Sequence, residues 1–205
     1  MILVKNLFIF FCLVFFFNSC YDNENTASNK KLDISITGDY QINSTLSKVN
    51  WEAKTALGIV HKGTILVSSG YVKITKGQLK GGKLIFDLNS LKANEINLEK
   101  SWETEVFLKS KDMFNVKTYP KAILKIISLD SSIVKADLTI LDKTKTIFFP
   151  AEFSINDSDL KVNANIVINR TDWGIFYASS SFTDWAKDKI IEDEISFVIN
   201  VVAEK

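Results

Sequence analysis

Residues 146–170, TIFFPAEFSINDSDLKVNANIVINR, contain the pattern that decides the fold. In both halves of this stretch every second residue is apolar. These residues are Ile147, Phe149, Ala151, Phe153 and Ile155, then Val162, Ala164, Ile166 and Ile168. Successive side chains of a β-strand point to opposite faces, so each half predicts a strand that is buried on one face and wet on the other. Arg170, the only arginine, falls on the apolar face of the second strand, where a guanidinium needs polar partners.

The same alternation recurs along most of the chain. We predict further strands at residues 49–55, 63–68, 70–75, 83–89, 122–128, 133–141 and 191–203, in addition to 146–155 and 161–170. Turn signals separate them, among them Ser69-Gly70, Lys76-Gly77 and Gly81-Gly82. Because strands do not alternate with helices, we expect an all-β fold with antiparallel strands.

One segment, residues 98–108, departs from this pattern. Leu98, Trp102 and Val106 recur there every fourth residue among Glu and Lys, which indicates a single amphipathic helix. Eight or nine antiparallel strands with one helix fit a sandwich or a closed barrel. A closed barrel has no edge strands, and about eight strands leave room for one small ligand.

The first 37 residues are not expected to be part of this fold. Residues 1–19 read as a signal peptide, with Lys5 ahead of an apolar run that is too short to span a bilayer. Cys20 follows Ser19 as in the lipobox of bacterial lipoproteins, so we predict that Cys20 is the lipid attachment site. An ordinary secretory signal with an incidental Cys is the alternative. Residues 20–37 read as a flexible tether, which leaves residues 38–205 as one domain.

Composition and motifs exclude several classes of function. The net charge of +1 and the pI near 7.6 provide no basic surface for nucleic acid. His61 is the only histidine, and Cys12 would be lost with the signal, so a metal site is not expected. Nucleophile-elbow, phosphate-loop, dinucleotide-binding and His-Glu-x-x-His motifs do not occur, so we do not expect an enzyme.

Nine short motifs occur in a fixed order. They are residues 40–42, 47–51, 58–63, 70–74, 86–90, 108–120 (LKSKDMFNVKTYP), 136–140, 170–175 (RTDWGI) and 191–195. In these motifs and their order the chain resembles the YceI family of exported, lipocalin-like, polyisoprenoid-binding proteins. The resemblance implies an extended, eight-stranded antiparallel lipocalin-like β-barrel with a helix near one end. Residues 104–107 (TEVF) differ from the polar stretch of many members, so no head-group contact is carried over to them.

The family's ligand is a long isoprenoid chain, such as that of a quinone or prenyl phosphate, which would lie non-covalently in an apolar tunnel. Candidate residues of the tunnel wall and mouth are Trp51, His61, Phe86, Phe114, Phe149, Phe153, Ala164, Ile166, Arg170 and Trp173. The apolar ones are equally plausible as plain core. Arg170 could meet a polar head group or form a structural ion pair with Asp172, Asp184 or Asp193, whereas His61 could cap a turn.

These observations predict a lipoprotein of the bacterial cell envelope, anchored in a membrane, that carries or sequesters an isoprenoid lipid. Two alternatives stay open: a membrane-displayed interaction module with a filled core, and an isomerase or cyclase. The sequence also leaves open whether the domain forms a homodimer.

Overall fold

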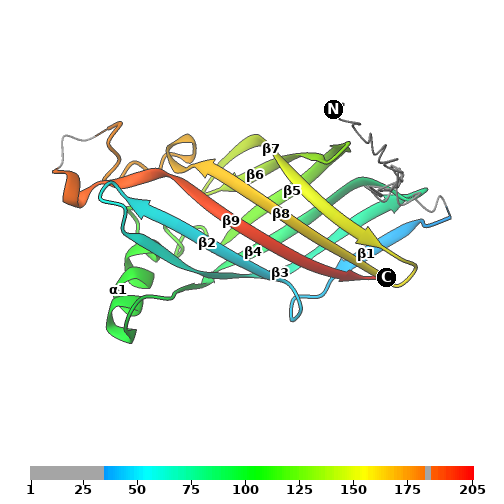
Figure 1. Cartoon of the computed structure of the whole chain (residues 1–205), viewed down its shortest axis with the longest axis horizontal. Coiled ribbons are helices and arrows are strands. Elements are labelled where there is room, and N and C mark those ends of the chain that lie inside the picture. Colours follow the sequence, from blue (N-terminus) through cyan, green and yellow to red (C-terminus); the bar gives the residue numbers. More distant parts are fainter. Residues whose placement is uncertain (1–34, 183–185) are drawn as a thin grey trace, which may run out of the picture. The chain divides into compact units, whose positions relative to one another are not determined.

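Nine β-strands and one α-helix make up the part of the chain that the computed structural model describes, residues 35–182 and 186–205. The predicted signal peptide, Cys20 and nearly all of the predicted tether lie outside the described residues. The strands are β1 (Gly38–Ile42), β2 (Lys48–Thr55), β3 (Val60–Thr75), β4 (Gln78–Ala93), β5 (Lys121–Asp130), β6 (Ile133–Ile140), β7 (Lys143–Ile155), β8 (Asp159–Asn169) and β9 (Ile191–Glu204). Helix α1 (Leu98–Lys109) follows β4 and precedes β5 in the chain, and it lies at one end of the barrel (Figure 1).

The strands form a closed antiparallel barrel. Each of the strands from β4 to β9 pairs with the next, β9 pairs with β2, β2 with β3, and β3 with β4, which closes the ring. Strand β1 pairs with β3 and β9, so β1 and β2 together fill one place between these two strands. The ring therefore has eight strand positions, and the predicted antiparallel lipocalin-like barrel is confirmed.

Strands β7 and β8 show why this sequence closes into a barrel. Ala151 and Ala164 face each other in the register of the pair, and both are buried. The alternate residues of both strands, such as Phe148 and Asn165, are exposed. The alternation that predicted a wet face and an apolar face is thus confirmed, and the apolar faces of β2 to β9 supply the main core.

Two of the expected turns are wrong. Strand β3 is continuous through Ser69-Gly70, and strand β4 is continuous through Gly81-Gly82. At Gly70 the register of the β3–β4 pair has just shifted, and a Cβ atom there would collide with the carbonyl oxygen of Lys83. The glycine allows close approach of two long strands at a bulge instead of reversing the chain. The turn at Lys76-Gly77 is confirmed.

Helix α1 begins where predicted and ends one residue later. Asn97 caps its start, because the Asn97 side chain accepts a hydrogen bond from the Lys100 backbone N–H at 2.8 Å. Leu108 is its buried residue, whereas Leu98, Trp102 and Val106 are 89%, 66% and 49% exposed. The apolar stripe that predicted the helix therefore faces solvent. In the described residues no helix has the length and apolar character needed to cross a bilayer.

The two ends of the barrel are built differently. Helix α1, the β2–β3 turn and the β8–β9 connection lie at one end, called here the α1 end (Figure 1). The turns after β3, β5 and β7 lie at the opposite end. A second buried cluster closes that opposite end, and the Tyr40 hydroxyl donates a hydrogen bond of 2.9 Å to the Asn156 carbonyl there. The cluster consists of Ile36, Tyr40, Val72, Ile74, Leu160 and Ala203.

Candidate functional site

Three apolar cavities follow one another inside the barrel. The mouth cavity, about 110 Å³, lies under α1 and is lined by Trp51, Ala53, His61, Ile65, Leu91, Thr104, Phe107, Leu108, Met113, Phe114, Arg170, Ile191, Ile195 and Phe197. The central cavity, about 50 Å³, is lined by Val49, Ile65, Phe86, Leu88, Phe114, Ala122, Leu124, Leu138, Ile140, Ile166, Phe197 and Ile199. The distal cavity, about 50 Å³, is lined by Val72, Ile74, Leu79, Leu84, Leu124, Ile126, Val134, Phe149, Ala151, Phe153, Leu160, Val162, Ala164, Ile199 and Val201.

Neighbouring cavities share wall residues. Ile65, Phe114 and Phe197 line both the mouth and the central cavity. Leu124 and Ile199 line both the central and the distal cavity. The three cavities are therefore sections of one apolar passage that side chains interrupt at two places.

Most of the candidate ligand-binding residues line this passage. Trp51, His61 and Arg170 border the mouth cavity, Phe86 and Ile166 the central cavity, Phe149, Phe153 and Ala164 the distal cavity, and Phe114 both of the first two. Trp173 lies outside the described lining: it is buried, and its indole N–H donates to the Leu138 carbonyl at 3.2 Å.

Trp51 is fixed at the mouth by the glycine opposite to it. Trp51 and Gly63 are partners in the β2–β3 pair, and the Trp51 indole N–H donates to the carbonyl oxygen of Lys92 at 3.0 Å. A Cβ atom on Gly63 would collide with that oxygen. The absence of a side chain at residue 63 thus lets the indole lie across the backbone and form part of the cavity wall.

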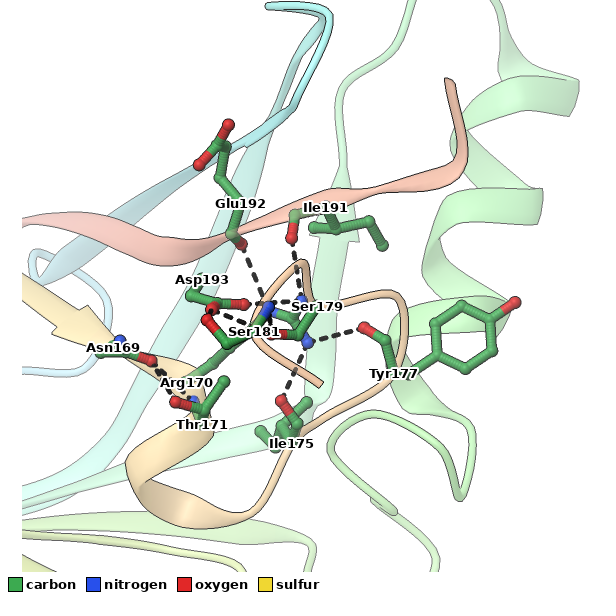
Figure 2. A network of polar contacts seen from close by, with 10 residues as sticks. All are labelled: Asn169, Arg170, Thr171, Ile175, Tyr177, Ser179, Ser181, Ile191, Glu192 and Asp193. Atoms are coloured by element: carbon green, nitrogen blue, oxygen red, sulfur yellow. Dashed lines mark hydrogen bonds and ion pairs between the residues drawn. The ribbon is translucent and has the colours of Figure 1, made fainter. Parts of the chain in front are cut away.

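Arg170 is fully buried, and protein groups surround its guanidinium (Figure 2). Nη1 donates to the carbonyls of Ile175 and Tyr177 at 2.9 and 2.8 Å. Nε donates to the Glu192 carbonyl at 3.2 Å, and Nη2 to the Ile191 carbonyl at 3.0 Å. These four bonds join the start of the β8–β9 connection to its end.

Asp193 supplies the charge that balances this cation. Its Oδ1 lies 3.2 Å from Arg170 Nη2, and its Oδ2 accepts hydrogen bonds from the hydroxyls of Ser179 and Ser181 at 2.9 and 3.0 Å (Figure 2). Burial lowers the pKa of Arg170 from its ordinary value, and the Asp193 carboxylate opposes that shift. Asp193, one of the three carboxylates considered from the sequence, is thus a partner of Arg170, whereas Asp184 lies outside the described residues. A contact of Arg170 with a ligand head group stays a prediction.

His61 is the ionisable side chain of the mouth that solvent reaches. Its Nδ1 lies 2.9 Å from Glu95 Oε1, and about a third of its side chain is exposed. Beside this pair, Glu105 accepts a hydrogen bond from the Ala93 backbone N–H and pairs with Lys92 at 3.1 Å. The mouth cavity is therefore bordered by the imidazole of His61, whereas the Lys92 ammonium pairs with Glu105 outside the lining of the cavity. The described residues contain no cluster of three side chains suited to holding a metal ion.

Several lining residues were not singled out from the sequence. On the strands these include Val49, Leu88, Leu138, Ile140 and Phe197. Their alternation could have found them, because they lie on the apolar faces of predicted strands. Thr104, Phe107 and Leu108 could not be found in this way, since only the position of α1 at the end of the barrel brings them to the mouth cavity.

Comparisons with known proteins agree with this architecture. The family model described as YceI-like domain matches residues 40–203. The crystal structure of BcnA from Burkholderia cenocepacia is similar, with 20% identity, 79% of this chain and 99% of that chain covered, and a TM-score of 0.61. A polyisoprenoid binding domain from Saccharophagus degradans implicated in plant cell wall breakdown shows 15% identity, 80% and 97% coverage, and a TM-score of 0.57. A search of curated proteins found no match.

Proposed function

This chain belongs to the YceI family, and from that premise we propose that its barrel binds one long apolar chain, a polyisoprenoid, along the three cavities. The observation that carries the proposal is the row itself: three apolar cavities in line, separated only by side chains. A linear hydrocarbon fits such a passage better than a compact ligand does. The solved domain from Saccharophagus degradans, whose description names polyisoprenoid binding, has the same fold.

The energetics of such a ligand are favourable. Burial of each apolar carbon contributes roughly 0.8 kcal/mol, so four isoprene units contribute on the order of 15 kcal/mol before the costs of binding. The ligand has to enlarge the passage, because known ligand sites hold roughly 300–1,000 Å³ and each of these cavities is much smaller. Rotation of Phe114 and Phe197 would join the mouth and central cavities. Rotation of Leu124 and Ile199 would open the distal one.

We further propose that the protein acts in the bacterial cell envelope, held on a membrane by acyl chains on Cys20. The support is the sequence of residues 1–20, in which a signal-like apolar run ends at that cysteine. A membrane-held barrel would keep its lipid ligand near the bilayer that contains it. The proposed role is binding without chemical conversion, since the passage is lined almost entirely by hydrocarbon.

The small cavity volumes favour one alternative, a barrel with a filled core that serves as an interaction module. Ala164→Trp separates the two functions, because Ala164 lines the distal cavity. A filled core would lose about 1–3 kcal/mol of stability to overpacking. A ligand passage would instead lose affinity for a long-chain quinone, with little change in stability.

Binding is measured by titrating residues 32–205, which form one compact unit, with a long-chain quinone while following tryptophan fluorescence. Asn165→Trp is the matched control, because Asn165 is the exposed neighbour of Ala164 on the same strand. If neither the wild type nor either variant binds quinone, and only Ala164→Trp is destabilised, the interaction module is selected.

A further inference from the structure

Large exposed apolar side chains are concentrated at the α1 end of the barrel. They come from the β2–β3 turn, from α1 and the segment before it, and from the β8–β9 connection. We call them the apolar rim: Leu57, Ile59, Val60, Ile96, Leu98, Trp102, Val106, Phe176, Tyr177 and Phe182. At the opposite end, the residues between the paired strands are Lys76 and Gly77, Ser131 and Ser132, and Asn156, Asp157 and Ser158. The turns at the opposite end are therefore polar, although Ile133 beside one of them is exposed, and the α1 end is the more apolar of the two.

The rim and the entrance of the passage share helix α1. Thr104, Phe107 and Leu108 on the inner side of α1 line the mouth cavity, while Trp102 and Val106 on its outer side belong to the rim. One aromatic contact joins α1 to the β8–β9 connection, and a second lies within that connection. Phe107 meets Tyr177 edge to face, with ring centroids 5.1 Å apart, and Phe176 packs on Phe182 at 4.4 Å. Three distant segments of the chain thus bring exposed apolar side chains to the α1 end of the barrel, where the mouth cavity lies.

We propose that the apolar rim docks on the surface of a phospholipid bilayer and places the mouth of the barrel against the lipid. This inference rests on the proposed function, since a polyisoprenoid resides in a bilayer and would otherwise have to cross water to reach the passage. A protein partner on the rim would cover the entrance, whereas a bilayer supplies the ligand through it. Trp and Tyr beside aliphatic side chains match the boundary between head groups and acyl chains.

The charges beside the rim specify the kind of bilayer. Glu99 and Glu103 lie next to the stripe on α1 together with Lys100 and Lys109. Because both signs are present, the surface has no electrostatic preference for anionic lipid. Docking therefore needs no anionic head group, and it should change less than about twofold between low and high salt.

The test uses phosphatidylcholine vesicles without any isoprenoid, so that docking is measured apart from ligand binding. Residues 32–205 should cosediment with the vesicles. A rim variant with Leu98→Gln, Trp102→Gln and Val106→Gln should have a partition constant at least roughly tenfold lower. The matched control carries Leu46→Gln, Phe148→Thr and Val167→Thr, which are similarly exposed outside the rim and should leave partitioning unchanged.

A local readout places the contact at the rim. The chain has a fourth tryptophan, Trp185, close in sequence to Phe182, so this experiment uses protein that carries Trp185→Phe. In that protein Trp102 fluorescence should be quenched by vesicles with brominated acyl chains, and Trp102→Phe should remove that quenching while vesicle binding persists. Trp51 and Trp173 are buried and serve as an internal reference.

Three results would overturn the docking proposal. They are wild-type protein that stays in the supernatant, a control variant that loses as much binding as the rim variant, and dimers of the wild type that the rim substitutions dissociate. Quinone affinity in detergent solution is measured on the same variants. A protein that binds quinone but not vesicles contradicts the docking surface alone, and one that does not bind quinone contradicts the proposed function.

Discussion

Arg170 joins the two ends of the β8–β9 connection, and its energetic role follows from its burial. Removal of one partner of a buried ion pair leaves the other charge uncompensated. Arg170→Leu should lower the free energy of unfolding by about 3–5 kcal/mol, because Asp193 and four backbone carbonyls lose their partner. Arg170→Lys should lower the free energy of unfolding by a smaller amount, because lysine keeps the positive charge but lacks the planar set of N–H donors of the guanidinium. Chemical denaturation measures both.

Lys161→Gln on the exposed face of β8 is the control, with an expected change within about 0.5 kcal/mol. If Arg170 only stabilises the β8–β9 connection, the folded fraction of each variant should bind quinone with wild-type affinity. A stable Arg170→Leu protein that has lost affinity would instead assign the residue to the ligand head group.

Tyr40 makes the stability of the protein depend on alkaline pH. Its side chain is buried at the end of the barrel opposite α1. Burial, and to a smaller extent the charge of Asp157, raises the pKa of Tyr40 above its ordinary value. The neutral phenol is therefore favoured by folding. This contribution is complete below the unfolded pKa of about 10 and is lost as the pH rises through the higher folded pKa.

The matching substitution is Tyr40→Phe. It should cost about 1 kcal/mol at neutral pH through the lost bond to Asn156, and it should remove part of the fall in stability above pH about 10. Melting curves from pH 7 to 11 compare the two proteins. Parallel falls in both would contradict the assignment to this hydroxyl.

The direction of Arg170 was predictable from the sequence, but most of its partners were not. Position 170 continues the apolar alternation of β8, and this placed the side chain inside. The four carbonyls that accept from Arg170 are backbone groups, so the side chains of their residues do not take part in the contact. Strand β8 ends at Asn169, and the Asn169 side chain caps the turn that follows. Every residue has a backbone carbonyl, so the sequence does not indicate which carbonyls accept hydrogen bonds from Arg170. Only the folded structure shows them.

At the scale of elements, α1 is the exception to the usual rule that an apolar stripe faces the core. Substitution of Leu98, Trp102 and Val106 by Gln should change the unfolding free energy by less than about 0.5 kcal/mol, because all three side chains are exposed. Leu108→Ala should cost about 2–5 kcal/mol, because Leu108 is the buried residue of the helix. Thermal denaturation of both variants decides whether the stripe or Leu108 holds the helix to the barrel.

Strand identity was predictable where alternation is strict, as in β7 and β8. The lengths of β3 and β4 were not, because Gly70 and Gly81 look like turn residues in the sequence and act as bulge residues in the sheet. A glycine that lets two strands approach and a glycine that reverses the chain have the same local signature. The pairing of β3 with β4, which decides between them, is a long-range property.

At the scale of the whole molecule, the sequence predicted eight or nine antiparallel strands but not how they close. Closure depends on β1 and β2 sharing one place between β3 and β9. The pairs with β9 join residues that are between 136 (Thr55 and Ile191) and 163 (Gln41 and Glu204) positions apart. The three cavities are equally non-local, since each is lined from several strands. The family resemblance predicted an apolar tunnel. The structure shows that side chains divide the apolar interior into three cavities.

The proposed anchor makes a prediction for the full chain. Cys20→Ala should abolish incorporation of labelled palmitate. Without the acyl chains, less of the protein should be recovered in the membrane fraction. Ser19→Ala is the control, because it leaves the cysteine in place. Palmitate incorporation into Cys20→Ala would show that Cys20 is not the attachment site.

Native mass spectrometry of residues 32–205 purified from a bacterial envelope, followed by organic extraction, tests whether the barrel binds a polyisoprenoid. We expect one isoprenoid lipid per chain, recovered unchanged after incubation with the protein. A ligand-free mass, together with no uptake of added quinones or prenyl phosphates, would contradict polyisoprenoid binding.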